Sequence, residues 1–144
     1  MDPITAIGLL AALVQLIDKT VEVTQYLNHV RNAPKERTEL STQILNLQSV
    51  LFLLRDRLEE AGPEETRAKW FLSIQALAQK NGPIDQFKEA IERLKKKLKP
   101  ADSGIKRFGK ALIWTIEKEQ VKEILDDTEL LKSNISLALL EDQL

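Results

Sequence analysis

The sequence has no cysteine and contains little glycine, proline or aromatic residue. The lack of cysteine excludes a disulfide scaffold, thiol catalysis and a zinc site built on cysteine. Five glycines and five prolines in 144 residues are too few for an all-β fold, which needs a turn about every 8–12 residues. Aliphatic and charged residues dominate instead, with 43% of residues hydrophobic and 30% charged. This composition is typical of a helical bundle with a solvated outer surface.

The residue types that usually carry catalysis or metal binding form no recognisable site. His29 is the only histidine, and one imidazole cannot hold zinc or activate a nucleophile without further partners. We interpret it as a polar group near a helix C-terminus. The run Asn81-Gly82-Pro83 marks a helix boundary, not a phosphate-binding loop, and neighbouring acids on a helix point about 100° apart, so they form no acid–base pair. We therefore expect no enzyme, no cofactor and no metal.

Apolar residues recur at helical spacing through most of the chain. The clearest seam advances in steps of four and three residues, and its uncharged middle, 44–54, is expected to be well buried: Leu40, Ile44, Leu47, Leu51, Leu54 and Leu58. With glycine and proline as boundaries, the sequence predicts helices from Pro3 to about 29, from about 34 to about 61, from about 66 to 80, from 83 to about 99, around 108–114, and from about 115 or 117 onward. The predicted fold is all-α, a single bundle of five to six helices over residues 1–144.

The first helix is unusually apolar. Asp2 and Pro3 open it, which is unlike the basic start of a secretory signal, so we expect no export by that route. The 15 uncharged residues from Pro3 to Ile17 would span about 22 Å, against a hydrocarbon core of about 30 Å, which is too short for a permanent membrane span. We expect this helix at the centre of the bundle, with one stripe directed inward: Ile7, Leu10, Val14, Ile17, Val21, Thr24 and Leu27.

The net charge of −1 conceals a local basic cluster. Between 93 and 110, one acid, Asp102, stands against eight basic residues: Arg93, Lys95, Lys96, Lys97, Lys99, Lys106, Arg107 and Lys110. This segment carries +7 and leaves −8 for the rest of the chain, including an acidic outer face on the last helix. The cluster could bind anionic lipid head groups, at about 1 kcal/mol per basic residue, or an acidic protein surface; the alternative is a solvated helix end. No stacking platform accompanies it, so we expect no nucleic acid.

Several short strings, taken in order, resemble the HeLo-like N-terminal domain of fungal STAND and NLR-like proteins. They cover nearly the whole chain: Met1-Asp2-Pro3-Ile4-Thr5-Ala6-Ile7-Gly8-Leu9, Tyr26-Leu27-Asn28, Ala33-Pro34-Lys35, Trp70-Phe71, Gly82-Pro83-Ile84-Asp85-Gln86-Phe87-Lys88, Leu94, Leu98-Lys99-Pro100 and Lys110-Ala111-Leu112-Ile113-Trp114-Thr115. None of them is a catalytic fingerprint.

The resemblance implies a helical bundle ahead of a nucleotide-binding, ankyrin or lipase-like region, acting in heterokaryon incompatibility or innate-immune programmed cell death. It implies a cytoplasmic protein that oligomerises on activation, moves to the plasma membrane and releases an N-terminal segment into it. By position that segment runs from Ile4 to Ile17: Ile4, Ile7, Leu9, Leu10, Leu13, Val14, Leu16 and Ile17. Gly8 is its only glycine, so glycine-zipper packing is not expected.

Two functional hypotheses follow. The first is a membrane-targeting, cell-death-inducing signalling domain that joins the uncharged N-terminal segment to the basic cluster. The second is a protein–protein module that oligomerises, or docks on a downstream domain to inhibit it, without a membrane step. The leucine-rich seams, the acidic last helix and the lack of a full-length span favour this alternative.

Overall fold

The computed structural model describes residues 5–30, 32, 34–98 and 114–143, and this part of the chain is a bundle of α-helices. The helices are α1 (Ala6–Asn28), α2 (Pro34–Glu60), α3 (Lys69–Leu77), α4 (Pro83–Leu98) and α6 (Lys118–Asp142), with a 3₁₀ helix η1 (Pro63–Arg67) between α2 and α3. The predicted all-α bundle is thus confirmed. Most of the short helix predicted at 108–114 lies outside the described residues.

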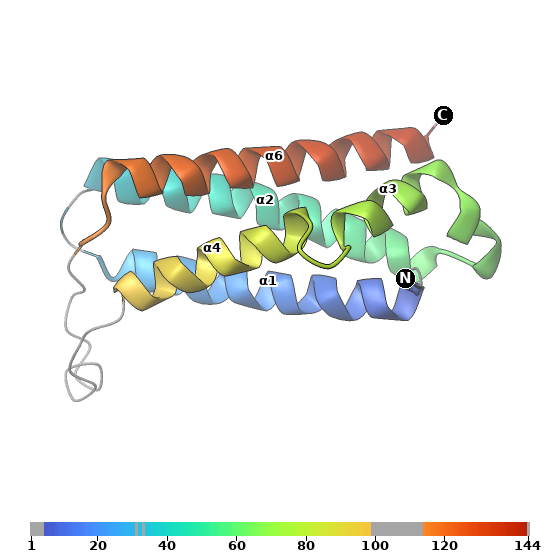
Figure 1. Ribbon diagram of the computed structural model, residues 1–144, viewed down its shortest axis with the longest axis horizontal. Coiled ribbons are helices and arrows are strands. Elements are labelled where there is room, and N and C mark those ends of the chain that lie inside the picture. Colours follow the sequence, from blue (N-terminus) through green and yellow to red (C-terminus); the bar gives the residue numbers. More distant parts are fainter. Residues whose placement is uncertain (1–4, 31, 33, 99–113, 144) are drawn as a thin grey trace.

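The helices run along the long axis of the molecule and enclose the core between four edges (Figure 1). Helix α1 packs on α2 and α4, and α6 packs on α2, α3 and α4. Helices α3 and α4 follow one another and together make the fourth edge. We name the outer faces by the helices that border them: α1–α2, α2–α6, α4–α6 and α1–α4.

Local signals explain most helix boundaries. Thr5 is the N-cap of α1, and its Oγ1 accepts a hydrogen bond from the backbone N–H of Gly8 at 3.1 Å. Between α3 and α4, Asn81 adopts a left-handed φ of 62°, and its N–H donates to the Asp85 carboxylate at 2.9 Å. The helix predicted at 66–80 is wrong in its bounds, because Ala68 is extended and separates η1 from α3.

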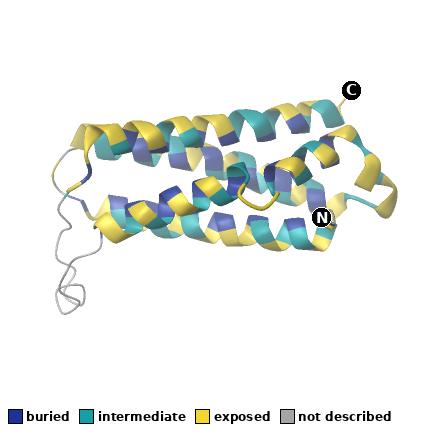
Figure 2. Ribbon diagram, viewed as in Figure 1, coloured by how far each residue is buried: buried dark blue, intermediate teal, exposed yellow. Residues whose placement is uncertain are grey.

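The leucine seam of α2 is confirmed, since all six of its residues are buried. Figure 2 shows buried residues on the inward sides of the helices and exposed ones on their outer sides. The prediction that the whole uncharged stretch 44–54 is buried was wrong. Leu45 is 47% exposed and Leu53 61% exposed, because a helix at the edge of a bundle buries only one stripe.

The predicted central position of the first helix was also wrong. Helix α1 lies at an edge of the bundle, bordered by α2 and α4. Ile7 is 83% exposed and Val14 42% exposed, and Val21 is exposed too. Three residues of the predicted inward stripe, Ile17, Thr24 and Leu27, are buried as expected. The rest of the buried surface comes from an adjacent stripe that is turned by part of the helix circumference: Leu9, Leu13, Leu16, Thr20 and Val23. With apolar residues all round the first turns, more than one stripe fits the helical period, and in these turns the stripe that carries Leu9, Leu13 and Leu16 fills the core.

Candidate functional site

Among the described residues, the N-terminal half of α1, Ala6–Ile17, is held to the rest of the bundle by apolar packing. This half has no charged residue. Four large side chains of it are buried: Leu9, Leu13, Leu16 and Ile17. Leu10 is partly buried, and Ile4 lies outside the described residues. Within the described chain, none of its side chains makes a hydrogen bond or ion pair to another helix.

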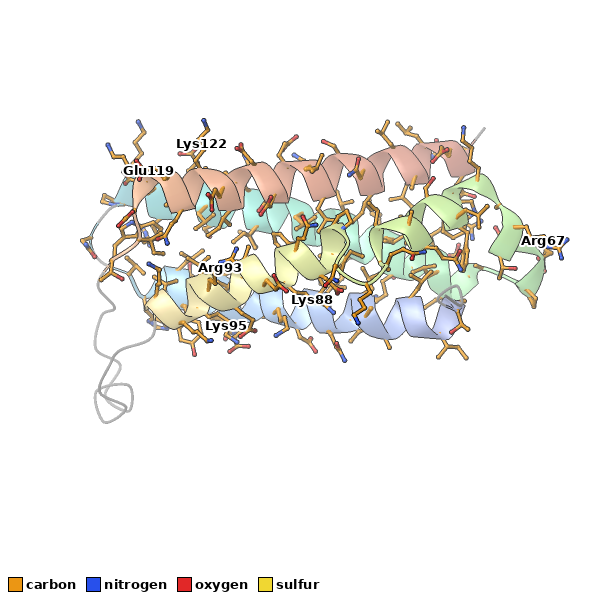
Figure 3. The ribbon with its side chains drawn as sticks, viewed as in Figure 1. Arg67, Lys88, Arg93, Lys95, Glu119 and Lys122 are labelled. Atoms are coloured by element: carbon orange, nitrogen blue, oxygen red, sulfur yellow. The ribbon has the colours of Figure 1, made fainter. Side chains whose placement is uncertain are left out.

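Polar contacts anchor the C-terminal half of α1, from Asp18 to Asn28. Lys19 forms an ion pair with Glu92 of α4, and Lys95 Nζ lies 2.8 Å from a Glu22 carboxylate oxygen and 3.4 Å from one of Glu92. Toward α2, Gln48 Nε2 donates to Thr20 Oγ1 at 3.1 Å. Figure 3 shows Lys95 on the edge of α4 that borders α1.

The ion pairs between α1 and α4 shift the pKa values of their members. The hydrogen bond from Lys19 lowers the pKa of Glu92, with a smaller effect of Lys95 in the same direction. The hydrogen bond with Glu22 raises the pKa of Lys95. Both shifts favour the charged forms, so the α1–α4 contact stays ionised at neutral pH.

The register between α1 and α4 leaves the start of α1 with less cover. Lys19 meets Glu92 and Glu22 meets Lys95, so the two helices run parallel with a constant offset of 73 residues. That offset places Pro83, the first residue of α4, level with Leu10. The first turn of α1 therefore extends beyond the end of α4.

The described members of the basic cluster do not lie beside the N-terminal segment. Arg93, Lys96 and Lys97 are exposed in the last turns of α4, whereas Lys95 is engaged with α1. By the same offset Lys96 lies level with Val23, about 24 Å along the axis from Ile7 at 1.5 Å per residue. The other four predicted members lie outside the described residues: Lys99, Lys106, Arg107 and Lys110.

Acids of α6 lie beside part of this cluster. A small cavity of about 40 Å³ between α4 and α6 is lined by Arg93 and Lys97 on one side and by Glu123 and Asp127 on the other. Burial raises the pKa of Asp127, the nearby Glu123 raises it further, and Arg93 opposes them. The acidic face predicted for the last helix thus borders basic residues of α4 in this region.

An ionic cluster centred on Arg57 was not predicted from the sequence. Its guanidinium donates to Asp142 at 2.6 and 2.9 Å, pairs with Glu65, and lies 4.6 Å from the centre of the Trp70 ring. Both pairs raise the pKa of Arg57, and Arg57 lowers the pKa of each carboxylate. This cluster ties α2, η1, α3 and the end of α6 together. Because 85 residues separate Arg57 from Asp142, only paired variation among relatives could have indicated it.

The described residues form neither a metal site nor a membrane span. No group of three or more acidic, histidine or cysteine side chains is placed to hold a metal ion there. No helix in that part of the chain is long and apolar enough to cross a membrane. His29 is the C-cap of α1 and donates its backbone N–H to Tyr26 O at 3.0 Å.

Comparison with family models, curated proteins and solved structures gives no match to this chain. The resemblance to the HeLo-like family therefore stays a prediction from the sequence.

Proposed function

We propose that the bundle is a membrane-targeting signalling domain of the HeLo-like, cell-death-inducing kind, whose N-terminal segment leaves the bundle and enters a membrane on oligomerisation. One observation carries the proposal: the uncharged half of α1 is held by apolar packing alone, while the other half is anchored by ion pairs. A helix fastened in this way can open from its first turn as far as Asp18 and stay attached beyond it.

The energy of release supports a triggered process. Exposing a buried Leu or Ile side chain to water costs about 1.5–3 kcal/mol, so the four buried ones of this segment together cost about 6–12 kcal/mol. A single bundle in water therefore keeps the segment packed. Transfer of these side chains into a bilayer restores most of this free energy. Ile7 and Val14 add a further favourable contribution on insertion, because they are already exposed and lose no packing in the core. Bringing several bundles together supplies the further bias.

The exposed end of α4 has a supporting role in the proposal. Because Lys96 lies about 24 Å along the axis from Ile7, the basic residues of this end and the segment reach the same membrane together only when the long axis lies along it. Each basic residue near such a surface contributes about 1 kcal/mol. In this orientation the cluster holds the bundle on the membrane while the segment inserts.

Leakage of anionic liposomes tests the proposal, with Ile7→Glu as the test variant. Because Ile7 is already exposed, the substitution leaves the core intact and places a charge in the inserting segment. Leakage should fall at least about tenfold for Ile7→Glu and stay unchanged for Leu130→Glu, a control at an exposed leucine of α6. Equal leakage from Ile7→Glu and the unmodified chain would refute the membrane step.

The alternative, an oligomerisation or docking module without membrane activity, is favoured by exposed leucines remote from α1. Leu130, Leu137 and Leu140 are each more than half exposed on α6. A chain that self-associates but never floats with anionic or neutral vesicles would establish this alternative.

A further inference from the structure

Three of the four outer faces of the bundle carry charges of both signs along their length, whereas the described charges of the α1–α2 face border an apolar patch. The charged faces are the α2–α6 face with Lys35, Glu39, Lys122 and Asp126, the α4–α6 face with Arg93, Lys97, Glu123 and Asp127, and the α1–α4 face with Lys19, Lys88, Glu92 and Lys96. On the α1–α2 face, α2 contributes no charge between Leu40 and Leu54. In a chain with 30% charged residues, a helix surface of this length without charge indicates a surface that a partner covers.

Apolar side chains from both helices meet on this face: Val21 and Leu45 are exposed, and Phe52 is partly buried. Val21 lies two residues, or about 200° of helix, from the α4-bound Lys19, so it faces away from α4 and toward α2. On α2, Leu45 and Phe52 lie three residues before and four after Gln48, which bonds to Thr20 of α1. These spacings place them on the flank toward α1.

The register brings these residues together. Helices α1 and α2 run antiparallel (Figure 1), and with Thr20 opposite Gln48, Val21 lies within about a turn of Leu45, and Val14 within about a turn of Phe52. Ile7, Val14 and Val21 are seven residues apart, as are Leu45 and Phe52. Seven-residue spacing is the repeat by which helices pack on partner helices.

Two opposite charges border this apolar patch. Asp18 is exposed on α1. Arg55 of α2 has its guanidinium 4.9 Å from the centre of the Phe52 ring and its Nη2 3.4 Å from a carboxylate oxygen of Asp56, and its Nε is buried without a hydrogen-bond partner among the described residues. By the Thr20–Gln48 register the two lie about five residues apart along the axis. When two copies pack face to face about a two-fold axis that passes between Asp18 and Arg55, each Asp18 lies opposite the Arg55 of the other copy. The face is therefore complementary in charge to the same face of a second copy.

We propose that the α1–α2 face binds the same face of a second copy of this chain, about a two-fold axis between Asp18 and Arg55. Each Asp18 then meets the Arg55 of the other copy, and the apolar residues interdigitate around the axis. The 23 residues of α1 give the face a length of about 34 Å, and two neighbouring helices give it a width of about 20 Å. The footprint of about 700 Å² is close to the roughly 800 Å² per partner of a standard interface.

Sedimentation velocity of the 144-residue chain over a range of concentrations tests the proposal. The unmodified chain should form dimers, and Asp18→Arg should weaken them at least about tenfold by placing two like charges together. Combining Asp18→Arg with Arg55→Asp should restore the dimer, which a merely damaged fold would not do. Leu45→Glu should weaken the dimer about 100-fold by burying an unpaired charge, whereas Leu137→Glu on α6 should leave it unchanged.

Several outcomes would overturn the proposal. They are a chain that stays monomeric at every concentration, a dimer that tolerates Leu45→Glu, and a double charge exchange that fails to restore association while circular dichroism shows an intact fold. A monomer whose flotation with phosphatidylcholine vesicles depends on Leu45 would assign the face to lipid instead. Asp18, Leu45 and Arg55 all lie outside the segment 4–17, so their variants change the dimer without changing the segment. Ile7→Glu changes both, so leakage that falls for Ile7→Glu but not for Leu45→Glu identifies the membrane step.

Discussion

Substitution of Thr20 is the most specific test of the contact between α1 and α2. Its side chain is fully buried, and its Oγ1 donates to the Ile17 carbonyl at 2.7 Å while accepting from Gln48 Nε2 at 3.1 Å. The substitution Thr20→Val keeps the shape of the side chain and removes the hydroxyl. The amide of Gln48 then loses its acceptor in a part-buried position.

The expected loss of stability is that of a donor left unpaired, about 1–2 kcal/mol. For 144 residues, with an unfolding entropy of about 2.1 cal/mol/K per residue, this corresponds to a fall in Tm of about 3–7 °C. Replacing Gln48 by methionine removes the unpaired donor. In a Gln48→Met background, Thr20→Val should therefore lose little further stability.

Thr128→Val is the matched control. Thr128 is also fully buried and donates to a carbonyl of its own helix, Ile124 O, at 2.6 Å, but no side chain of another helix bonds to it within the described chain. We expect this variant to stay within about 0.5 kcal/mol of the unmodified chain. Urea unfolding followed by far-UV circular dichroism measures both, and equal losses for Thr20→Val and Thr128→Val would refute the reasoning.

Two further predictions concern the ends and faces of the helices. Arg57→Met should make the free energy of unfolding less sensitive to acid. In the folded chain Arg57 lowers the pKa values of Glu65 and Asp142. The stabilisation from these two carboxylates is therefore present above their unfolded pKa values of about 4–4.5, and it is lost as the pH falls through their lower folded pKa values. Urea titrations between pH 7 and pH 3 should show the two chains converging in acid, and a constant difference would contradict this. Leu13→Ala should lose about 2–5 kcal/mol and Ile7→Ala less than about 0.5 kcal/mol, because Leu13 is buried and Ile7 exposed; similar losses would show that α1 is turned differently.

The sequence predicted the helices far better than it predicted how they face. The seam from Leu40 to Leu58 could be read because polar residues separate its members and leave only one apolar stripe. In α1 the apolar residues surround the helix, so the sequence alone did not distinguish the stripe of Leu9 and Leu13 from that of Ile7 and Val14. The spacing of apolar residues indicates which sides of a helix are apolar. Where several sides are apolar, the packing of the neighbouring helices determines which of them is buried.

The side-chain contacts between helices could not be predicted from the sequence, for a different reason. Lys95 reads as one of several lysines at a helix end, yet it is fixed by Glu22 from another helix. The extended Ala68 between η1 and α3 has no glycine or proline beside it to indicate a break. Such contacts depend on the relative placement of elements many residues apart, about which local spacing carries no information.

The first turn of α1 and the last turn of α6 lie at the same end of the bundle (Figure 1), which determines how the domain responds to force. A force that separates these two ends detaches α1 from the bundle one turn at a time, and it does not break all contacts of α1 at once. The apolar turns yield one after another at low force, until the load reaches the Lys19–Glu92 pair. There the ion pairs act as a mechanical stop, so partial extension and full unfolding become two separate events in a single-molecule pulling trace.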